Sequence, residues 1–492
     1  MWLRSARILA GKIVEVRQDG GNNMQVRMSR GSVRPLRVSV VTGLVVASMT
    51  MATAALGTSI THPSVVLENP SNDTARLVPD AAVARPYANA VGQSGNRMFV
   101  GGRFETVLDG SGSPQLARQN FMIFDADTGA VADSPAMDSV VWAIEPYTGA
   151  DPADPADDAV FVGGEFTDVD GVPHRRLVKL DAATGAVDPD FNPTIGGGQV
   201  KDLHMYNGAA GPMLFAAGSV PTKPLMALDP ETGANTGYFN NVNINTPIPN
   251  AFGSLSVNNV AISPAGTELV GVGNFSKVGA AARKRVFRLN LGATTPTLSP
   301  WYYKPFAEDC NVTTARRLAY ATDVDYSPDG TWFVISATGH VSAPRDANKT
   351  VCDGVARFET DGPNNPFRPT WINYTGGDTI WSVATSGAAA YVQGHFQHLD
   401  VKGRLFGENL NDDAVDRLGV GAVDPGEYTT DASTHVTTTV RAGGKALDWD
   451  PAKPATQGGK QLLVTDAGLW VASDSKRFAG EPRYGIAFAP LP

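Results

Sequence analysis

The chain has 492 residues, among them 52 glycines and 34 prolines, with only 18% charged residues and a formal net charge of −9. Short runs of Val, Phe, Tyr and Thr lie between Gly- and Pro-rich segments, a pattern typical of many short strands joined by tight turns. No long run after residue 60 has apolar residues at helical spacing, which disfavours an α/β fold. Lys and Arg are scattered, so we expect neither a nucleic-acid-binding nor an anionic-membrane-binding surface.

Residues 28 to 57 have the pattern of an export signal. A basic start precedes the uncharged apolar run from Val38 to Leu56, and small residues follow at cleavage-like positions. The run is long enough to span a bilayer, so an uncleaved anchor is the alternative and the one membrane contact we expect. Residues 1 to 27 suit no targeting signal, and we interpret them as a start codon assigned too early. The sequence predicts a secreted or cell-surface protein.

A short motif is repeated through the rest of the chain. Phe99–Phe104 reads Phe-Val-Gly-Gly-Arg-Phe, and Phe161–Phe166 differs from it at one position. Full or weaker copies recur at roughly 60-residue intervals and begin at Phe99, Phe161, Phe215, Val270, Phe333, Tyr391 and Trp470. A short apolar strand precedes most copies, and a strand ending in a turn such as Asp-x-x-Thr-Gly follows, then a strand with an aromatic residue. This order predicts an all-β fold, a single seven-bladed β-propeller with four antiparallel strands per blade.

The predicted propeller covers residues 64 to 492. Its last unit ends with Tyr484–Pro490, a third strand, and lacks a fourth. Residues 64 to 86 precede the first inner strand, and we expect them to supply it. Pairing the first and last segments in one blade would close the ring and remove an open sheet edge.

The repeated segments resemble those of the delta-60 repeat proteins, exported β-propeller proteins of actinobacteria. The shared pattern is Val-Gly-Gly-x-Phe, then Leu-Asp-x-x-Thr-Gly and an aromatic-Pro strand. The resemblance spans about residues 75 to 491 and is strong in the C-terminal third, for example at Asp448-Trp-Asp-Pro451 and Gly468-Leu-Trp-Val471. It implies a fold and an exported location, and names no substrate.

Cys310 and Cys352 are the two cysteines of the chain. In an exported protein an isolated pair is more often a disulfide than a metal or catalytic site. Closing a loop of about 40 residues contributes roughly 3 to 4 kcal/mol to stability. We therefore predict a disulfide.

The sixth unit holds the candidate ligand-binding residues. In a propeller, the loop that enters the inner strand and the loop between the second and third strands lie on one face. Thr375–Thr379 is the first kind of loop, and Gly394–Asp400 begins the second. We expect Asp378, His395, His398 and Asp400 to converge at one rim, where their oxygen and nitrogen atoms suit a polar ligand or a divalent cation. The alternative is that Asp378 caps a turn and the histidines are exposed loop residues. The same geometry places Cys310 and Cys352 on this face.

A second candidate is a column of polar residues on the inner strands. The residues just before each core aliphatic are Asn89, Ala143, Asp202, Asn259, Asp323 and Ser382. Two positions on, Glu145, His204 and Asp325 follow. These side chains either line a wet central channel or, in a sharper hypothesis, form an acidic channel that holds a cation. No resident cofactor is otherwise expected.

Catalytic signatures are weak in this sequence. Gly110-Ser-Gly-Ser-Pro114 lacks the last Gly of a hydrolase elbow. The acidic turns also resemble those of quinoprotein dehydrogenase propellers, which would predict eight units and regular Gly-Trp docking. We therefore assign no catalytic residue and predict an exported scaffold that binds a glycan, a cell-wall polymer or a protein. The alternative is a hydrolase or lactonase-like metal enzyme with a site at the sixth-blade rim or the channel mouth.

Overall fold

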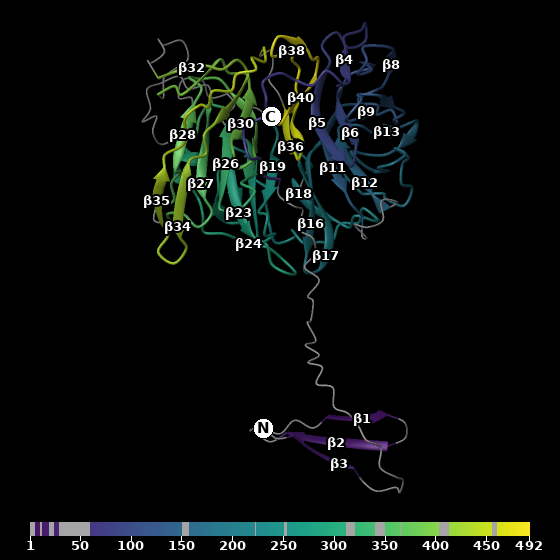
Figure 1. Ribbon diagram of the computed structural model, residues 1–492, viewed down its shortest axis with the longest axis vertical. Coiled ribbons are helices and arrows are strands. Elements are labelled where there is room, and N and C mark those ends of the chain that lie inside the picture. Colours follow the sequence, from purple (N-terminus) through teal and green to yellow (C-terminus); the bar gives the residue numbers. More distant parts are fainter. Residues whose placement is uncertain are drawn as a thin grey trace. The chain divides into compact units, whose positions relative to one another are not determined.

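The computed structural model describes residues 60–492 except 150–156, 222, 250–252, 311–319, 340–349, 365, 403–412 and 455–459, together with three N-terminal strands (Figure 1). The chain divides into two units, Met1–Thr53 and Ala54–Pro492. In the first unit, β1 (Ser5–Leu9), β2 (Lys12–Gln18) and β3 (Met24–Met28) form an antiparallel sheet. From residue 29 onward the predicted export segment, 28 to 57, lies outside the described residues, and the reading of residues 1 to 27 stays a prediction. No helix in the described part of the chain is long and apolar enough to cross a membrane.

The second unit consists of consecutive antiparallel sheets in which strands follow one another in chain order. The first sheets are β5 (Tyr87–Ser94), β6 (Arg97–Arg103), β9 (Phe121–Asp125) and β10 (Val131–Ala132); β11 (Val141–Tyr147), β12 (Ala159–Gly164) and β15 (Leu177–Asp181); and β16 (Val200–Gly208), β17 (Gly211–Gly218) and β18 (Leu225–Leu228). The next are β19 (Ser256–Ile262), β20 (Glu268–Asn274), β23 (Val286–Asn290) and β24 (Thr297–Leu298); and β25 (Ala321–Tyr326), β26 (Trp332–Ala337), β27 (Gly354–Glu359) and β28 (Trp371–Tyr374). The last are β29 (Ile380–Thr385), β30 (Ala390–Gly394) and β33 (Val420–Val423); and β36 (Gln461–Thr465), β37 (Gly468–Ala472) and β40 (Ile486–Pro490).

Further strands form separate small sheets. One has three strands, β4 (Arg76–Val78), β7 (Thr106–Leu108) and β8 (Gln115–Ala117). The others are pairs: β13 (Asp168–Val169) with β14 (Val172–Pro173), β21 (Lys277–Val278) with β22 (Ala281–Ala282), β31 (His398–Leu399) with β32 (Val415–Asp416), β34 (Glu427–Asp431) with β35 (Val436–Arg441), and β38 (Arg477–Phe478) with β39 (Glu481–Pro482). Helical structure in the described residues is limited to short 3-10 segments such as η2 (Lys304–Ala307). The unit is all-β, as predicted.

The repeated motif forms the second strand of a sheet, and its glycines let the next sheet approach. A Cβ atom on Gly163 would lie 2.6 Å from Cγ1 of Val200 in the neighbouring inner strand. The acidic turns also have the expected chemistry: Oδ1 of Asp125 accepts a hydrogen bond from the backbone N–H of Thr128 at 2.9 Å, and Gly129 has a φ of 69°. These local features explain why the motif recurs once per sheet.

Apolar side chains fill the space between neighbouring sheets. One cluster joins Phe161 of β12 to Val200 and Leu214 of the next sheet. The predicted fourth-strand aromatics take part, since Phe191 lies 5.2 Å from Phe161 and Trp449 lies 5.3 Å from Tyr391, measured between ring centroids. Burial of each sheet face against its neighbour stabilises the repeat.

The fourth element of a sheet is often reduced. In the sheets of β11, β16 and β29 it is a single bridge, Leu180 with Val187, Leu228 with Asn235 and Val423 with Ala446. Pro193 follows the aromatic Phe191 by two residues, and a residue without an N–H cannot extend a ladder at that point.

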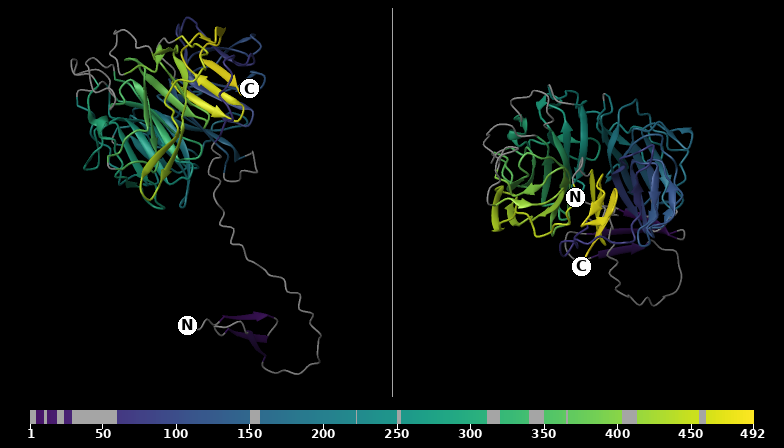
Figure 2. Two further views of the ribbon diagram at one scale, coloured as in Figure 1. Left: turned by 60° about the vertical axis from the view of Figure 1, so that its left-hand side comes forward. Right: turned by 90° about the horizontal axis from the view of Figure 1, so that it is seen from above.

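The inner strands lie next to one another in chain order, and the last also lies next to the first. β11 contacts both β5 and β16, and β36 contacts β29 and β5. In Figure 1 the yellow strands β36 and β40 lie beside β5, and Figure 2 shows the same neighbourhood from two other sides. The backbone N–H groups of Leu67 and Ser71 donate to the carbonyls of Pro490 and Phe488, each at 2.8 Å. Chain segments from both ends of the unit are thus hydrogen-bonded at β40.

Candidate functional site

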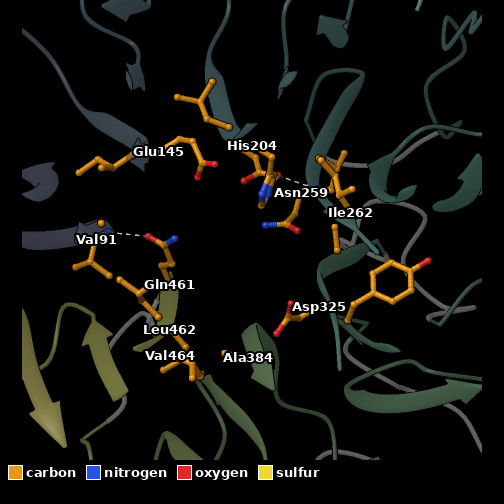
Figure 3. Close-up of a pocket in the computed structure, with 18 of the residues that line it drawn as sticks. Val91, Glu145, His204, Asn259, Ile262, Asp325, Ala384, Gln461, Leu462 and Val464 are labelled. Carbon is orange, nitrogen blue, oxygen red and sulfur yellow. Dashed lines mark hydrogen bonds and ion pairs between the residues drawn. The ribbon is translucent and has the colours of Figure 1, made fainter. Parts of the chain in front are cut away.

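A cavity of about 930 Å³ lies between the inner strands (Figure 3). Its walls come from β5, β11, β16, β19, β25, β29 and β36, and its polar side chains include Glu145, His204 and Asp325, which point into the space in Figure 3. This is the channel in which the sequence predicted a polar column.

Side chains of the polar column link neighbouring inner strands. Oδ2 of Asp202 accepts the backbone N–H of Val260 at 2.7 Å, and Oδ2 of Asp323 accepts that of Val383 at 2.8 Å. Gln461 does the same for Val91 at 2.6 Å (Figure 3). Because the same position in each strand makes the same bond, these strands run in one direction with equivalent residues at one level of the channel.

A second level of links lies two residues further along. Oε1 of Glu145 accepts the N–H of Met205, and Oδ2 of Asp325 accepts the N–H of Thr385, both at 2.7 Å. The carboxylates of the column therefore satisfy backbone donors of the adjacent sheet. Among the described residues, no group of three His, Cys, Asp or Glu side chains is arranged to hold a metal ion.

The enclosed position shifts the ionisation of these groups. Desolvation raises the pKa of Glu145 to about 7, of Asp325 to about 6 and of Asp323 to about 8. Desolvation alone would lower the pKa of His204, but Asp202, whose Oδ2 lies 3.2 Å from Nε2, together with Glu145 and Asp325 raises it to about 9. His204 is therefore a cation at neutral pH, and it supplies positive charge to the acidic part of the channel.

A β-bulge recurs at the start of the inner strands. The pairing register shifts between Val141 and Ala143, between Val200 and Asp202, and at the matching place in four further strands. The bulged residues are Asn89, Trp142, Lys201, Asn258, Thr322 and Trp381. A bulge re-aims its side chain. Asn89 is consequently the equivalent of Trp142, one position away from the column in which the sequence placed it.

The bulged residues Trp142, Lys201 and Trp381, together with Lys460, bring lysines and tryptophans to one end of the channel. Nζ of Lys201 lies 3.2 Å from Oδ1 of Asn258, and Nζ of Lys460 lies 4.0 Å from the centroid of the Trp381 ring. Nε1 of Trp142 donates to Oε1 of Glu165 at 2.8 Å. The sequence interpretation missed this group. The inner strands repeat the order aliphatic, variable, polar, aliphatic, as in Val200-Lys-Asp-Leu203. The sequence interpretation considered only the polar residue of this order and not the variable residue before it.

The structure brings together the two loops predicted to form the sixth-blade rim. The backbone N–H of His395 donates to the carbonyl of Thr379 at 2.9 Å, and Nδ2 of Asn373 donates to Oδ1 of Asp400 at 2.5 Å. Within the first loop, the N–H of Asp378 donates to Oγ1 of Thr375 at 3.1 Å. The two loops therefore meet at Thr379 and His395.

The side chains of this rim have individual partners. Nδ1 of His398 lies 2.9 Å from Oδ1 of Asp416, while the Asp400 carboxylate also accepts the N–H of Ala446 at 3.1 Å. His395 is exposed. The structure thus places Asp400 in a loop-bracing role, and ligand binding by Asp378, His395, His398 and Asp400 stays a prediction.

Cys310 and Cys352 form the predicted disulfide, with their Cα atoms 5.7 Å apart. It borders the sixth-sheet loop, because the carbonyl of Asp353 accepts hydrogen bonds from both N–H and Oγ1 of Thr375 at 3.0 Å. The disulfide is consistent with an extracellular location.

Comparison with known proteins agrees with the sheet arrangement. Residues 156–191 match a family model described as "Domain of unknown function (DUF5122) beta-propeller". The second unit is a β-propeller. No curated protein sequence matches the chain.

Solved structures with a similar course of the chain include a Kuenenia stuttgartiensis hydrazine synthase (11% identity, 84% of this chain and 94% of that chain covered, TM-score 0.42), the Dos1 propeller (9%, 80% and 78%, 0.42) and the WD40 beta propeller domain of Doa1 (8%, 86% and 95%, 0.42). At these identities none of them bears on what this propeller binds or does.

Proposed function

We propose that this protein is an exported, seven-bladed β-propeller that acts as a binding scaffold. Each of β5, β11, β16, β19, β25, β29 and β36 begins one sheet, and each would be the inner strand of one blade. Closure of the ring is supported by the contact of β36 with β5 and by the bonds from Leu67 and Ser71 to β40. Residues 64 to 86 would then complete the last blade.

Export is the second part of the proposal. The disulfide supports an oxidising compartment. The basic and apolar pattern of residues 28 to 57 supports a cleaved signal or an anchor, and the delta-60 repeat resemblance to exported actinobacterial proteins agrees with both. Mass spectrometry of the mature N-terminus tests this part: a start between residues 52 and 60 supports cleavage, and retention of residues 38 to 56 supports an anchor.

The sixth-blade rim is the proposed binding face. The observation that carries this proposal is that Thr379 of the first loop accepts the backbone N–H of His395 of the second, that Asn373 of β28 holds Asp400, and that Thr375 of the first loop is bonded to Asp353 beside a disulfide. Such bracing holds exposed groups such as His395 in place, which lowers the entropic cost of binding. The partner class we propose is a glycan, a cell-wall polymer or a protein outside the cell.

An array of glycans, cell-wall polymers and extracellular proteins tests the binding face with the purified full chain. We expect a captured ligand whose affinity falls about tenfold in Asp378→Ala and in His395→Ala. The matched control is His174→Ala, directly after β14 and outside the sixth sheet, which should bind as the unaltered protein does. Equal binding by all variants would remove the sixth-blade rim from the proposal.

Elemental analysis of the same protein separates the scaffold from the metal-enzyme alternative. We expect no stoichiometric transition metal or calcium. One bound metal per chain, lost in the His395→Ala variant, would favour a metal-dependent enzyme at this rim instead.

A further inference from the structure

We propose that one mouth of the central channel binds an acidic saccharide through Trp142, Lys201, Trp381 and Lys460. The carboxylate of the sugar would lie between the two ammonium groups, and its C–H face would lie against an indole. This inference goes beyond the scaffold proposal, because it concerns the channel and requires none of the sixth-blade rim residues.

These four residues share one level of the channel. Trp142, Lys201 and Trp381 are the bulged residues of their strands. Lys460 directly precedes Gln461, and Gln461 makes the same inter-strand bond as Asp202. Lys460 is therefore the equivalent of Lys201. Trp142, Lys201 and Lys460 line the same cavity, and Lys460 contacts Trp381.

Neither lysine is ion-paired to a carboxylate among the residues that the structure describes. No carboxylate in the described part of the chain lies within ion-pair distance of either ammonium: Lys201 contacts an amide oxygen of Asn258, and Lys460 contacts an indole. Glu165 attracts Lys201 only from a greater distance, and it already accepts the indole N–H of Trp142. An enclosed cation without a counter-ion is costly, so an oxyanion placed there would gain strong charge-assisted hydrogen bonds.

Electrostatics supports the same reading. Burial lowers the pKa of Lys201, and it lowers the pKa of Lys460 to about 8, where attraction by Asp474 opposes the shift and repulsion by Lys201 adds to it. Both lysines line the same cavity, and a single carboxylate between them would relieve this repulsion.

The two indoles define the rest of the ligand. Trp142 and Trp381 are only partly buried, and Trp142 is held by its bond to Glu165. A flat, partly exposed aromatic face suits an apolar ligand face, and the cavity volume of about 930 Å³ is ample for a sugar. An inorganic anion would leave both indoles unused, and the net charge of −9 disfavours a polyanionic nucleic acid.

Isothermal titration calorimetry of the full chain at pH 7 tests the inference with glucuronate, glucose and inorganic phosphate. We expect glucuronate to bind more tightly than the other two, and its binding to weaken with added salt. Lys201→Met and Lys460→Met should each weaken glucuronate binding about tenfold or more. Lys277→Met, at an exposed lysine of β21, is the matched control and should bind as the unaltered protein does.

Melting temperatures separate loss of the site from loss of the fold. Removing an enclosed, unpaired charge should leave the melting temperature of Lys201→Met unchanged or raised while binding is lost. Glucose binding as tightly as glucuronate, or lysine variants that bind normally, would overturn the inference. Phosphate binding as tightly as glucuronate would overturn the saccharide assignment. His395→Ala should leave glucuronate binding unchanged, so this site and the sixth-blade rim succeed or fail independently.

Discussion

Gln461, in the last sheet of the propeller, accepts a hydrogen bond from the backbone N–H of Val91 in the first sheet, with Oε1 and N 2.6 Å apart. The two residues are separated by 370 positions in the chain. The bond belongs to the same series as those of Asp202 with Val260 and Asp323 with Val383. The contact between the ends of the unit therefore uses the same chemistry as the contacts between sheets that are consecutive in the chain.

Replacing Gln461 with Leu should lower the free energy of unfolding by about 1 to 3 kcal/mol, because the N–H of Val91 would lose its acceptor in a partly buried position. Urea denaturation followed by tryptophan fluorescence measures the change. Gln119→Leu, at an exposed glutamine, is the control and should change stability by less than about 0.5 kcal/mol. Equal stability of the two variants would show that this bond does not contribute to holding the end sheets together.

Reduction of the disulfide should destabilise the propeller. It joins residues 42 positions apart, and the chain-entropy model assigns such a loop roughly 3 to 4 kcal/mol. Denaturation of the unaltered protein with and without reductant should show a loss of this order, and the Cys310→Ser/Cys352→Ser double variant should resemble the reduced protein. Reductant should have no effect on the double variant; a further loss there would point to a different cause.

The sequence predicted the features that depend on local chemistry. The acidic turn at Asp125 follows from a short local pattern and the disulfide from the isolated pair of cysteines, and the structure confirms both. The β-propeller fold is confirmed too, while the count of seven blades and the closing strand stay proposals.

Other features were not visible in the sequence because they depend on pairing between strands. A bulge exists only in relation to the neighbouring strand, so the recurrent order around Lys201 marked a variable position without showing that its side chain lies at the channel mouth. The role of Asp323 depends on Val383, 60 residues later, whose N–H it accepts. Periodicity indicated that Asp323 faces the channel, but it did not predict the hydrogen bond from the backbone N–H of Val383.

Asp323 should make the stability of the protein depend on pH. Desolvation raises its pKa to about 8 in the folded protein, against about 3.9 in an unfolded chain. The folded state therefore holds the proton that the unfolded state releases, and stability contributed by this group is lost as the pH rises from about 4 through about 8. Asp323→Asn keeps an acceptor for Val383, and its free energy of unfolding should fall less over this range. A variant whose stability follows the same pH curve as the unaltered protein would contradict the assignment.

His204 should show the complementary effect of a stabilised cation. Its pKa is raised to about 9, against about 6.5 unfolded, through its pairing with Asp202 and the attraction of Glu145. Stability from its charge is complete below about pH 6.5 and disappears as the pH rises through about 9. His204→Gln should therefore be less stable than the unaltered protein at pH 6, and the difference should shrink at pH 10, where the imidazole has lost its proton. Denaturation of both proteins at the two pH values measures this. A deficit that is equal at both would mean that His204 contributes through packing rather than through its charge.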